Sequence, residues 1–146
     1  MRKFIVAGGQ LGAISRNETK ASAIKRMGEL MKQAAERGAK LIVFPELALT
    51  TFFPRWWSDN KAEFDAMFET KMPNDDVLPL FQLSEELEIA FHLGYAELTP
   101  EGRRFNTAIL TNCKGRIVGK YRKIHLPGHS DAVSYTHLTL PTNREV

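Results

Sequence analysis

The chain has 146 residues, of which 43% are hydrophobic and 25% are charged, with a formal net charge of +3 and one cysteine. This composition is typical of one soluble globular domain and excludes a disordered chain, and a single cysteine excludes an intramolecular disulfide. The small net charge gives no sign of a nucleic-acid or membrane partner, and no apolar stretch approaches the roughly 18 residues of a membrane span, so we expect a cytoplasmic protein.

The first segments predict a strand, a helix and a second strand. Phe4–Ala7 is a short apolar run ended by two glycines, as in a buried strand. Asn17 can cap the helix, and Gly38 suits the position just after it. The apolar positions of the helix recur at spacings of three and four: Ala21, Ile24, Met27, Leu30, Met31, Ala34 and Ala35. Leu41–Phe44 predicts a second buried strand, parallel to the first across a right-handed crossover.

Two shorter helices are predicted next. Asp59 can cap the first of them. Its inward-facing residues are then Phe64, Met67 and Phe68. Asp75 or Asp76 can begin the second, because Pro79 is tolerated in a first helical turn. The apolar side of that second helix consists of Leu80, Phe81, Leu83 and Leu87.

Three further strands complete the pattern. They are predicted at Ile89–Ala96, Phe105–Thr111 and Arg116–His125, with a turn at residues 112–115 joining the last two. The sequence therefore predicts an α/β fold with an antiparallel extension, forming one layer of a larger layered sheet.

The end of the chain follows a different pattern. "SDAVSYTHLTLPTNREV", residues 130–146, has neither a helical stripe nor strand alternation, and it resembles translated vector or adaptor sequence. We therefore expect residues 1–129 to be the domain and 130–146 to be a non-native tail. The alternative is a natural disordered terminus.

Glu46 is the lone charge in "LIVFPELALTTFFP", residues 41–54. Active sites of open α/β sheets lie beyond the carboxyl ends of strands, and Glu46 follows closely after Phe44. The apolar residues 52–54 predict partial desolvation of this carboxylate, which suits a general base. The alternative is a loop carboxylate that points to water.

Lys123 lies in "KYRKIHL" within the last predicted strand. Strand alternation places Ile117, Gly119, Tyr121, Lys123 and His125 on one face and Val118, Lys120, Arg122 and Ile124 on the other. Lys120 and Arg122 are then predicted to be solvent charges, whereas a half-buried Lys123 needs an anionic partner or an anion to stabilise. The alternative is a solvated basic edge strand that prevents aggregation, and a nucleic-acid patch has less support because only Tyr121 interleaves with the charges.

The histidines and the cysteine give weaker indications. His125 and His129 flank "LPG", and a spacing of four across proline and glycine is not helical, so a metal pair has little support. Cys113 lies in the predicted hairpin turn, where a thiol lacks the sheltered, activating surroundings of a nucleophile.

Together, these segments resemble the nitrilase, or carbon–nitrogen hydrolase, superfamily. "VFPELALT" resembles its glutamate motif and "KYRKIHL" its lysine motif. The longer stretches "FPELALTTFFPRW", "FHLGYAEL", "RRFNTAIL" and "KYRKIHLPGH" are similar to those of N-carbamoyl-D-amino-acid amidohydrolases. The resemblance covers about residues 3–129.

The resemblance implies the N-terminal part of an α-β-β-α sandwich and two members of a Glu–Lys–Cys triad. Glu46 would be the general base, Lys123 the ammonium near the oxyanion, and His125 a supporting residue. The substrate would be an N-carbamoyl-D-amino acid, which is hydrolysed to a D-amino acid, ammonia and carbon dioxide without a metal or other cofactor. The parent enzyme would be a homo-oligomer.

The nucleophilic cysteine of the family follows a later strand, beyond the lysine motif, and Cys113 does not match that motif. We therefore expect this chain to hold less than half of the parent and to be inactive alone. Two alternatives remain: another amidase of the superfamily, such as a β-ureidopropionase-like enzyme, or a short protein that uses this half-fold as a non-catalytic binding or assembly module.

Overall fold

A computed structural model describes residues 3–55 and 60–125 of the protein. Its elements in chain order are β1 (Val6–Gly8), α1 (Lys20–Glu36), β2 (Leu41–Val43), the 3-10 helix η1 (Phe53–Arg55), α2 (Lys61–Asp65), α3 (Leu78–Glu86), β3 (Ala90–Leu98), β4 (Arg104–Thr111) and β5 (Ile117–Arg122). The predicted cap at Asp59 and tail at 130–146 lie outside the described residues. Within them, no helix is long and apolar enough to span a membrane.

The strands form one sheet in the order β1-β2-β3-β4-β5. β1, β2 and β3 pair in parallel, whereas β3–β4 and β4–β5 pair antiparallel, which confirms the predicted parallel unit with an antiparallel extension. These directions make β1, β2, β3 and β5 end at one rim of the sheet, where β4 begins. We call this the carboxyl rim.

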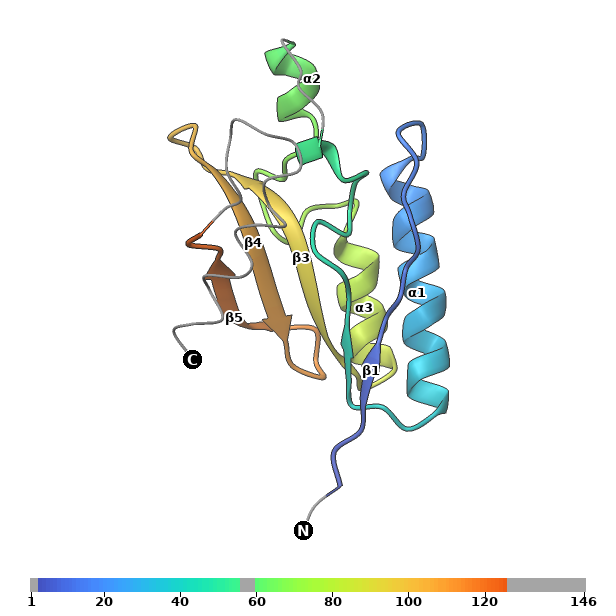
Figure 1. The fold of residues 1–146 in the computed structure, drawn as a ribbon. Helices are drawn as coiled ribbons and strands as arrows, with labels where there is room; N and C mark the ends of the chain where they lie inside the picture. The colour runs from blue at the N-terminus through green and yellow to red at the C-terminus, as the bar shows by residue number, and fades with distance from the viewer. Residues whose placement is uncertain (1–2, 56–59, 126–146) are drawn as a thin grey trace.

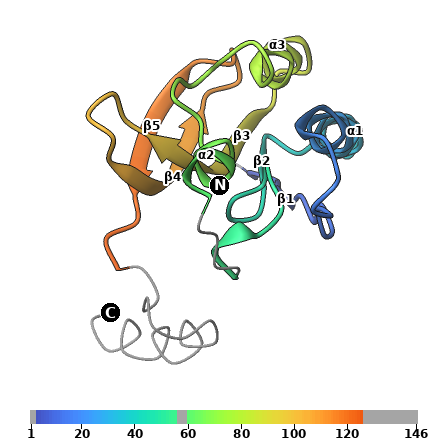
Figure 2. The same ribbon diagram turned by 90° about the horizontal axis from the view of Figure 1, so that it is seen from above.

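Helices α1 and α3 lie side by side on one face of the sheet (Figures 1 and 2). This helix face carries Ile42, Phe91, Leu93, Tyr95 and Ile109, each at most 2% exposed. Burying each large apolar side chain contributes about 1.5–3 kcal/mol. The opposite, open face carries Val6, Val43, Leu110 and Tyr121, each at least 38% exposed. The described residues thus form one helix-and-sheet layer of the sandwich that the resemblance implies.

The predicted stop of α1 is confirmed, and its predicted start is wrong. Gly38 has φ 78°, and its N–H donates to the Ala35 carbonyl at 2.8 Å while the Ala39 N–H donates to the Ala34 carbonyl at 3.0 Å. This pair of bonds is the Schellman motif, which favours glycine at this position. At the start, Thr19 replaces Asn17 as the cap because its hydroxyl accepts from the Ser22 N–H.

The buried stripe of α1 also differs slightly from the prediction. Ala23 is buried, whereas Ala21 is exposed and Leu30 is only partly buried. The members of the stripe that are buried as predicted are Ile24, Met27, Met31 and Ala34. The buried stripe therefore begins at Ala23 rather than at Ala21.

The two shorter helices begin later than predicted. In α2, the Asn60 side chain accepts from the Ala62 and Glu63 N–H groups. In α3, neither Asp75 nor Asp76 is the cap. The cap residue is Val77, which makes no side-chain cap hydrogen bond, and Pro79 lies in the first turn as predicted.

Strand β5 contains an irregularity that changes which side chains share a face. Its register moves from Leu110 opposite Gly119 to Thr111 opposite Ile117, so Val118 is an extra residue, as in a β-bulge. Ile117 therefore shares the helix face with Lys120, which corrects the prediction that Ile117 lies with Gly119 and Tyr121. The alternation from Gly119 to Arg122 is as predicted, but the strand ends at Arg122 rather than at the predicted His125.

Lys120 and Arg122 are not simple solvent charges, which corrects a second prediction. Both bind Glu97 of β3, which is only 7% exposed. One carboxylate oxygen of Glu97 accepts from Lys120 Nζ at 2.6 Å and Arg122 Nη2 at 2.8 Å, and the other accepts from Arg122 Nε at 2.8 Å and the Thr107 hydroxyl at 2.7 Å. We call these four residues the Glu97 cluster.

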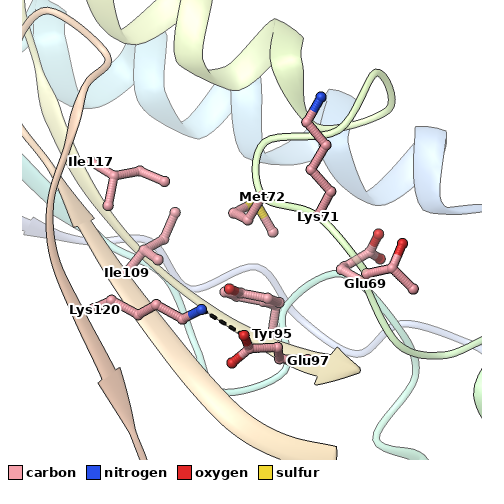
Figure 3. A pocket seen from close by; sticks show the side chains of 9 residues that line it. Glu69, Lys71, Met72, Tyr95, Glu97, Ile109, Ile117 and Lys120 are labelled. Carbon is pink, nitrogen blue, oxygen red and sulfur yellow. Dashed lines mark hydrogen bonds and ion pairs between the residues drawn. The ribbon is translucent and has the colours of Figure 1, made fainter. Parts of the chain in front are cut away.

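The Glu97 cluster borders a cavity of about 100 Å³ on the helix face. Figure 3 shows Lys120 reaching Glu97, with Tyr95 beside them and Met72 and Ile109 also lining the cavity. The hydrogen bonds from Arg122 are the main cause that lowers the pKa of Glu97 to about 2, with Lys120 and Thr107 adding to the effect against the opposing effect of burial.

Replacing Glu97 by Gln should lower stability in a pH-dependent way. The pKa of Glu97 is below its ordinary value in the folded protein, so the stabilisation is complete above about pH 4.5 and is lost as the pH falls through about 2. Near pH 7, we expect Glu97→Gln to reduce the free energy of unfolding by about 1–3 kcal/mol in urea titrations, because solvent screens the half-exposed Lys120 and Arg122.

Glu29→Gln is the control, because Glu29 forms only an exposed pair with Lys32. Between pH 5 and pH 2.5, the stability of the wild-type protein should fall more steeply than that of Glu97→Gln. Parallel pH dependences of the two proteins would show that this carboxylate is not held in its charged form.

Candidate active site

Glu46 and Lys123 follow strands that are not neighbours. β2 and β5 are separated by β3 and β4 in the sheet. At a strand spacing of about 4.8 Å, the two strands lie roughly 14 Å apart. Both residues follow the carboxyl ends of their strands, so they share the carboxyl rim, but a direct contact requires one of them to cross the sheet.

Residues 45–48 make this crossing over Gly94 of β3. The Phe44 N–H donates to the His92 carbonyl at 3.0 Å, and the Ala48 N–H donates to the Gly94 carbonyl at 2.9 Å. A Cβ on Gly94 would lie 3.1 Å from the Glu46 Cα and 3.1 Å from the Pro45 carbonyl oxygen. Gly94 therefore gives the segment room to pass over the open face.

The crossing segment adopts an uncommon backbone conformation at Leu47. Its φ is 50°, in the left-handed region that costs a residue with a side chain roughly 1–2 kcal/mol. The Leu47 side chain is buried, and it packs with Phe53 and Ala96 in a cluster that also contacts Phe64 and Phe68. This burial offsets the backbone cost and fixes the direction in which Glu46 leaves the segment.

The Glu46 and Lys123 side chains meet. Glu46 Oε1 accepts from Lys123 Nζ at 2.9 Å and from Asn106 Nδ2 at 2.6 Å. The Lys123 N–H in turn donates to the Asn106 carbonyl at 2.8 Å. Asn106, on β4, thus contacts both the carboxylate and the backbone that carries the ammonium.

Sequence reasoning did not identify Asn106 as a site residue. The alternation of β4 places it on the open face with Ala108 and Leu110, opposite Ala96 of β3. An amide beside Ala108 and Leu110 on one strand face was a usable indication, but its partner comes from a segment 60 residues earlier in the chain.

The surroundings of Glu46 are polar rather than apolar. Its side chain is 45% exposed and that of Lys123 is 38% exposed. The partial desolvation expected from residues 52–54 stays a prediction: Phe53 is buried against Phe64 and Phe68, and Phe52 is itself 38% exposed. What holds the carboxylate is its pair of charged and amide donors.

The other candidate residues lie outside this contact. His125 is exposed and is the last described residue. Among the described residues, the hydrogen bonds of the Glu46 side chain come from Lys123 and Asn106 and not from His125, so its supporting role stays a prediction. Cys113 is exposed in the β4–β5 turn, at the rim opposite Glu46. From Asn106 to the end of β4, the strand extends roughly 17 Å.

The arrangement combines an acceptor and a cation on one side of a solvent-accessible rim. A carboxylate can take a proton from a nucleophile, and a fixed ammonium can stabilise a developing oxyanion. In the described residues, no three His, Cys, Asp or Glu side chains are placed to hold a metal ion.

Comparisons with known proteins show what the chain is similar to. A family model described as carbon-nitrogen hydrolase matches residues 5–142. Omega-amidase NIT2 of Xenopus tropicalis is 25% identical over 107 residues, which cover 73% of this chain and 36% of the relative. Citrullinase of Francisella tularensis is 26% identical over 123 residues, which cover 84% of this chain and 40% of the relative.

The fold has solved counterparts. A carbon-nitrogen hydrolase from Helicobacter pylori superposes with a TM-score of 0.69 at 21% identity, covering 85% of this chain and 40% of that protein. The chain therefore spans less than half the length of these relatives and of this structure.

Gly94→Ala should displace the segment that carries Glu46. The added methyl meets backbone atoms of residues 45–47, so we expect a loss of about 1–3 kcal/mol in the free energy of unfolding and a displacement of Glu46 from Lys123. Urea titration measures the first effect, and the NMR signals of the Lys123 side chain report the second.

Gly119→Ala is the matched control. A Cβ there meets only the Leu110 Cβ at an ordinary 3.7 Å, on the same face of the sheet. We expect this variant to keep wild-type stability and Lys123 signals. If Gly94→Ala were equally silent, the close approach at Gly94 would not be what places Glu46.

Proposed function

Because the chain belongs to the carbon–nitrogen hydrolase family, we propose that Glu46 is the general base and Lys123 the oxyanion-stabilising cation of an enzyme that hydrolyses an amide-type C–N bond. The single observation that carries this proposal is the contact of Lys123 Nζ with Glu46 Oε1 at 2.9 Å, between residues that the sequence separates by 77 positions. Each residue lies in the motif for which the family resemblance assigns that role.

In the proposed reaction, the Glu46 carboxylate takes the proton of a cysteine thiol. A free thiol has a pKa of about 8.5, so a nearby base increases the fraction of reactive thiolate. The thiolate attacks the carbonyl carbon, and the Lys123 ammonium stabilises the oxyanion that forms. The C–N bond then breaks, ammonia leaves with a proton, and water cleaves the resulting acyl-enzyme to regenerate the thiol.

The nucleophile would be the third member of the Glu–Lys–Cys triad. Cys113 lies at the opposite rim and does not suit the role. Because the chain has no other cysteine, we propose that the thiol comes from a further segment of a longer parent protein. The match to 36% of an omega-amidase supports a longer parent protein. The genomic reading frame past Gly128 tests this: we expect a strand that ends in cysteine, and a natural stop without one would contradict it.

For the substrate, we propose an N-carbamoyl-D-amino acid. The supporting observations are the stretches "FPELALTTFFPRW" and "KYRKIHLPGH" and the similarity to a citrullinase, whose named substrate carries a carbamoyl group on nitrogen. The similarity to an omega-amidase favours a second candidate substrate, an ω-amide, which is a carboxylic acid with a terminal carboxamide. Both substrates present a terminal C(=O)–NH₂ group to the same acid–base pair.

Glu46→Gln and Lys123→Met should each abolish most activity in the parent protein. Removing a general base or an oxyanion-stabilising group typically costs about 10²–10⁴-fold in kcat. Ammonia release from an N-carbamoyl-D-amino acid measures the effect, with Glu29→Gln as a surface control that should retain wild-type activity. Wild-type turnover in Glu46→Gln would contradict the proposed function.

A substrate comparison separates the two candidates. The parent protein, incubated with N-carbamoyl-D- and L-amino acids and with an ω-amide, should show its highest kcat/KM for the D-carbamoyl compound. A preference for the ω-amide would leave the proposed roles of Glu46 and Lys123 intact and would contradict the proposed substrate. The 146-residue chain alone should release no ammonia, and release that Cys113→Ala removes would reassign the nucleophile.

A further inference from the structure

We propose that Glu97 is a positioning residue for Lys123, acting through Arg122 from the opposite face of the sheet. The inference rests on the proposed function of Lys123, because it concerns how that ammonium is held at the carboxyl rim. The Glu97 cluster lies on the helix face, whereas the Glu46–Lys123 contact lies on the open face.

Glu97 binds two consecutive helix-face side chains of β5. Its carboxylate accepts two hydrogen bonds from Arg122, each at 2.8 Å, and one from Lys120 at 2.6 Å. The paired bonds from Arg122 match the planar fork of a guanidinium, which fixes both distance and orientation. Because Glu97 is on β3 and Arg122 is on β5, this contact spans the intervening β4.

Two further contacts hold the groups of this cluster. The Thr107 hydroxyl of β4 donates to Glu97 at 2.7 Å, which keeps the carboxylate in place. The Arg122 guanidinium also lies over the Phe105 ring, 4.2 Å from its centroid. Arg122 is therefore restrained by an anion and by an aromatic face at the same time.

Arg122 and Lys123 are consecutive, so their side chains leave opposite faces of the chain. Arg122 is the last residue of β5, and the Lys123 N–H makes the next backbone hydrogen bond, to the Asn106 carbonyl at 2.8 Å. Fixing Arg122 on the helix face therefore fixes the point from which the Lys123 side chain reaches Glu46 on the open face.

The strand needs such an anchor at this point. Among the described residues, β5 is an edge strand that pairs only with β4, and the ends of edge strands open readily. A lysine side chain has a long, flexible stem, so its ammonium holds one position only if its backbone is fixed. The buried carboxylate of Glu97 supplies this restraint where the ladder ends.

The competing explanation is that the Glu97 cluster only stabilises the fold. The two explanations differ in which part of the sheet opens more readily when Glu97 is replaced. A purely stabilising role lowers the free energy of global unfolding and leaves local opening at the end of β5 unchanged, whereas a positioning role also makes that local opening easier.

The test compares Glu97→Gln with wild type and with the control Glu29→Gln, using the 146-residue chain. Amide hydrogen exchange, read by NMR, measures the protection of the Lys123 N–H and of the amides of β3 and β4. Competitive acetylation, read by mass spectrometry, measures the accessibility of Lys123 Nζ relative to the distant Lys20 and Lys32.

In Glu97→Gln, we expect exchange at the Lys123 N–H, which proceeds by local opening of the end of β5, to be at least about tenfold faster. The core amides of β3 and β4 should accelerate only by the factor that the measured loss of global stability gives. Acetylation of Lys123 should rise severalfold, whereas Lys20 and Lys32 should react as in wild type. An unchanged local exchange rate at the Lys123 N–H, or unchanged acetylation of Lys123, would overturn the inference.

Thr107→Val gives a milder version of the same test if Glu97→Gln does not fold. It removes one hydrogen bond to Glu97 at nearly constant volume, so the same local effect should appear in smaller size. Unchanged local exchange at the Lys123 N–H would again overturn the inference. Hydrolysis is not read in any of these measurements, so turnover in Glu46→Gln of the parent would refute the proposed function independently.

Discussion

The site depends on one close approach, the passage of residues 45–48 over Gly94. Strand order alone leaves Glu46 and Lys123 on opposite sides of two intervening strands. The crossing segment closes this gap, and it fits because Gly94 has no side chain to meet the backbone of Pro45 and Glu46. Burial of Leu47 against Phe53 and Ala96 then holds the segment despite its left-handed backbone.

The sheet has different roles on its two faces at the carboxyl rim. The open face carries Glu46, Asn106 and Lys123, with both charged groups accessible to a small substrate. The helix face carries the buried Glu97, whose charge is compensated by basic side chains of β5. Arg122 and Lys123 connect the faces, because adjacent residues of a strand point in opposite directions.

Much of this arrangement can be predicted from local sequence. The parallel unit, the glycine stop of α1 and the approach of the Glu46 and Lys123 motifs depend on periodicity, turn chemistry and a family resemblance. The bulge at Val118 could not be predicted, because it arises from pairing with β4. The same holds for the partner of Lys120 and Arg122: Glu97 precedes Lys120 by 23 positions, and only the sheet brings them together. Asn106 was missed because its role depends on the crossing segment.

The central claim is that Glu46 and Lys123 meet, and zero-length carbodiimide cross-linking tests it most directly. The reagent joins a carboxylate and an amine with loss of water only where they touch, and peptide mass spectrometry identifies the linked pair. We expect a cross-link between Glu46 and Lys123, with the exposed Glu29–Lys32 pair as an internal positive control. Cross-linking of Glu29 to Lys32 without any link between Glu46 and Lys123 would contradict the account.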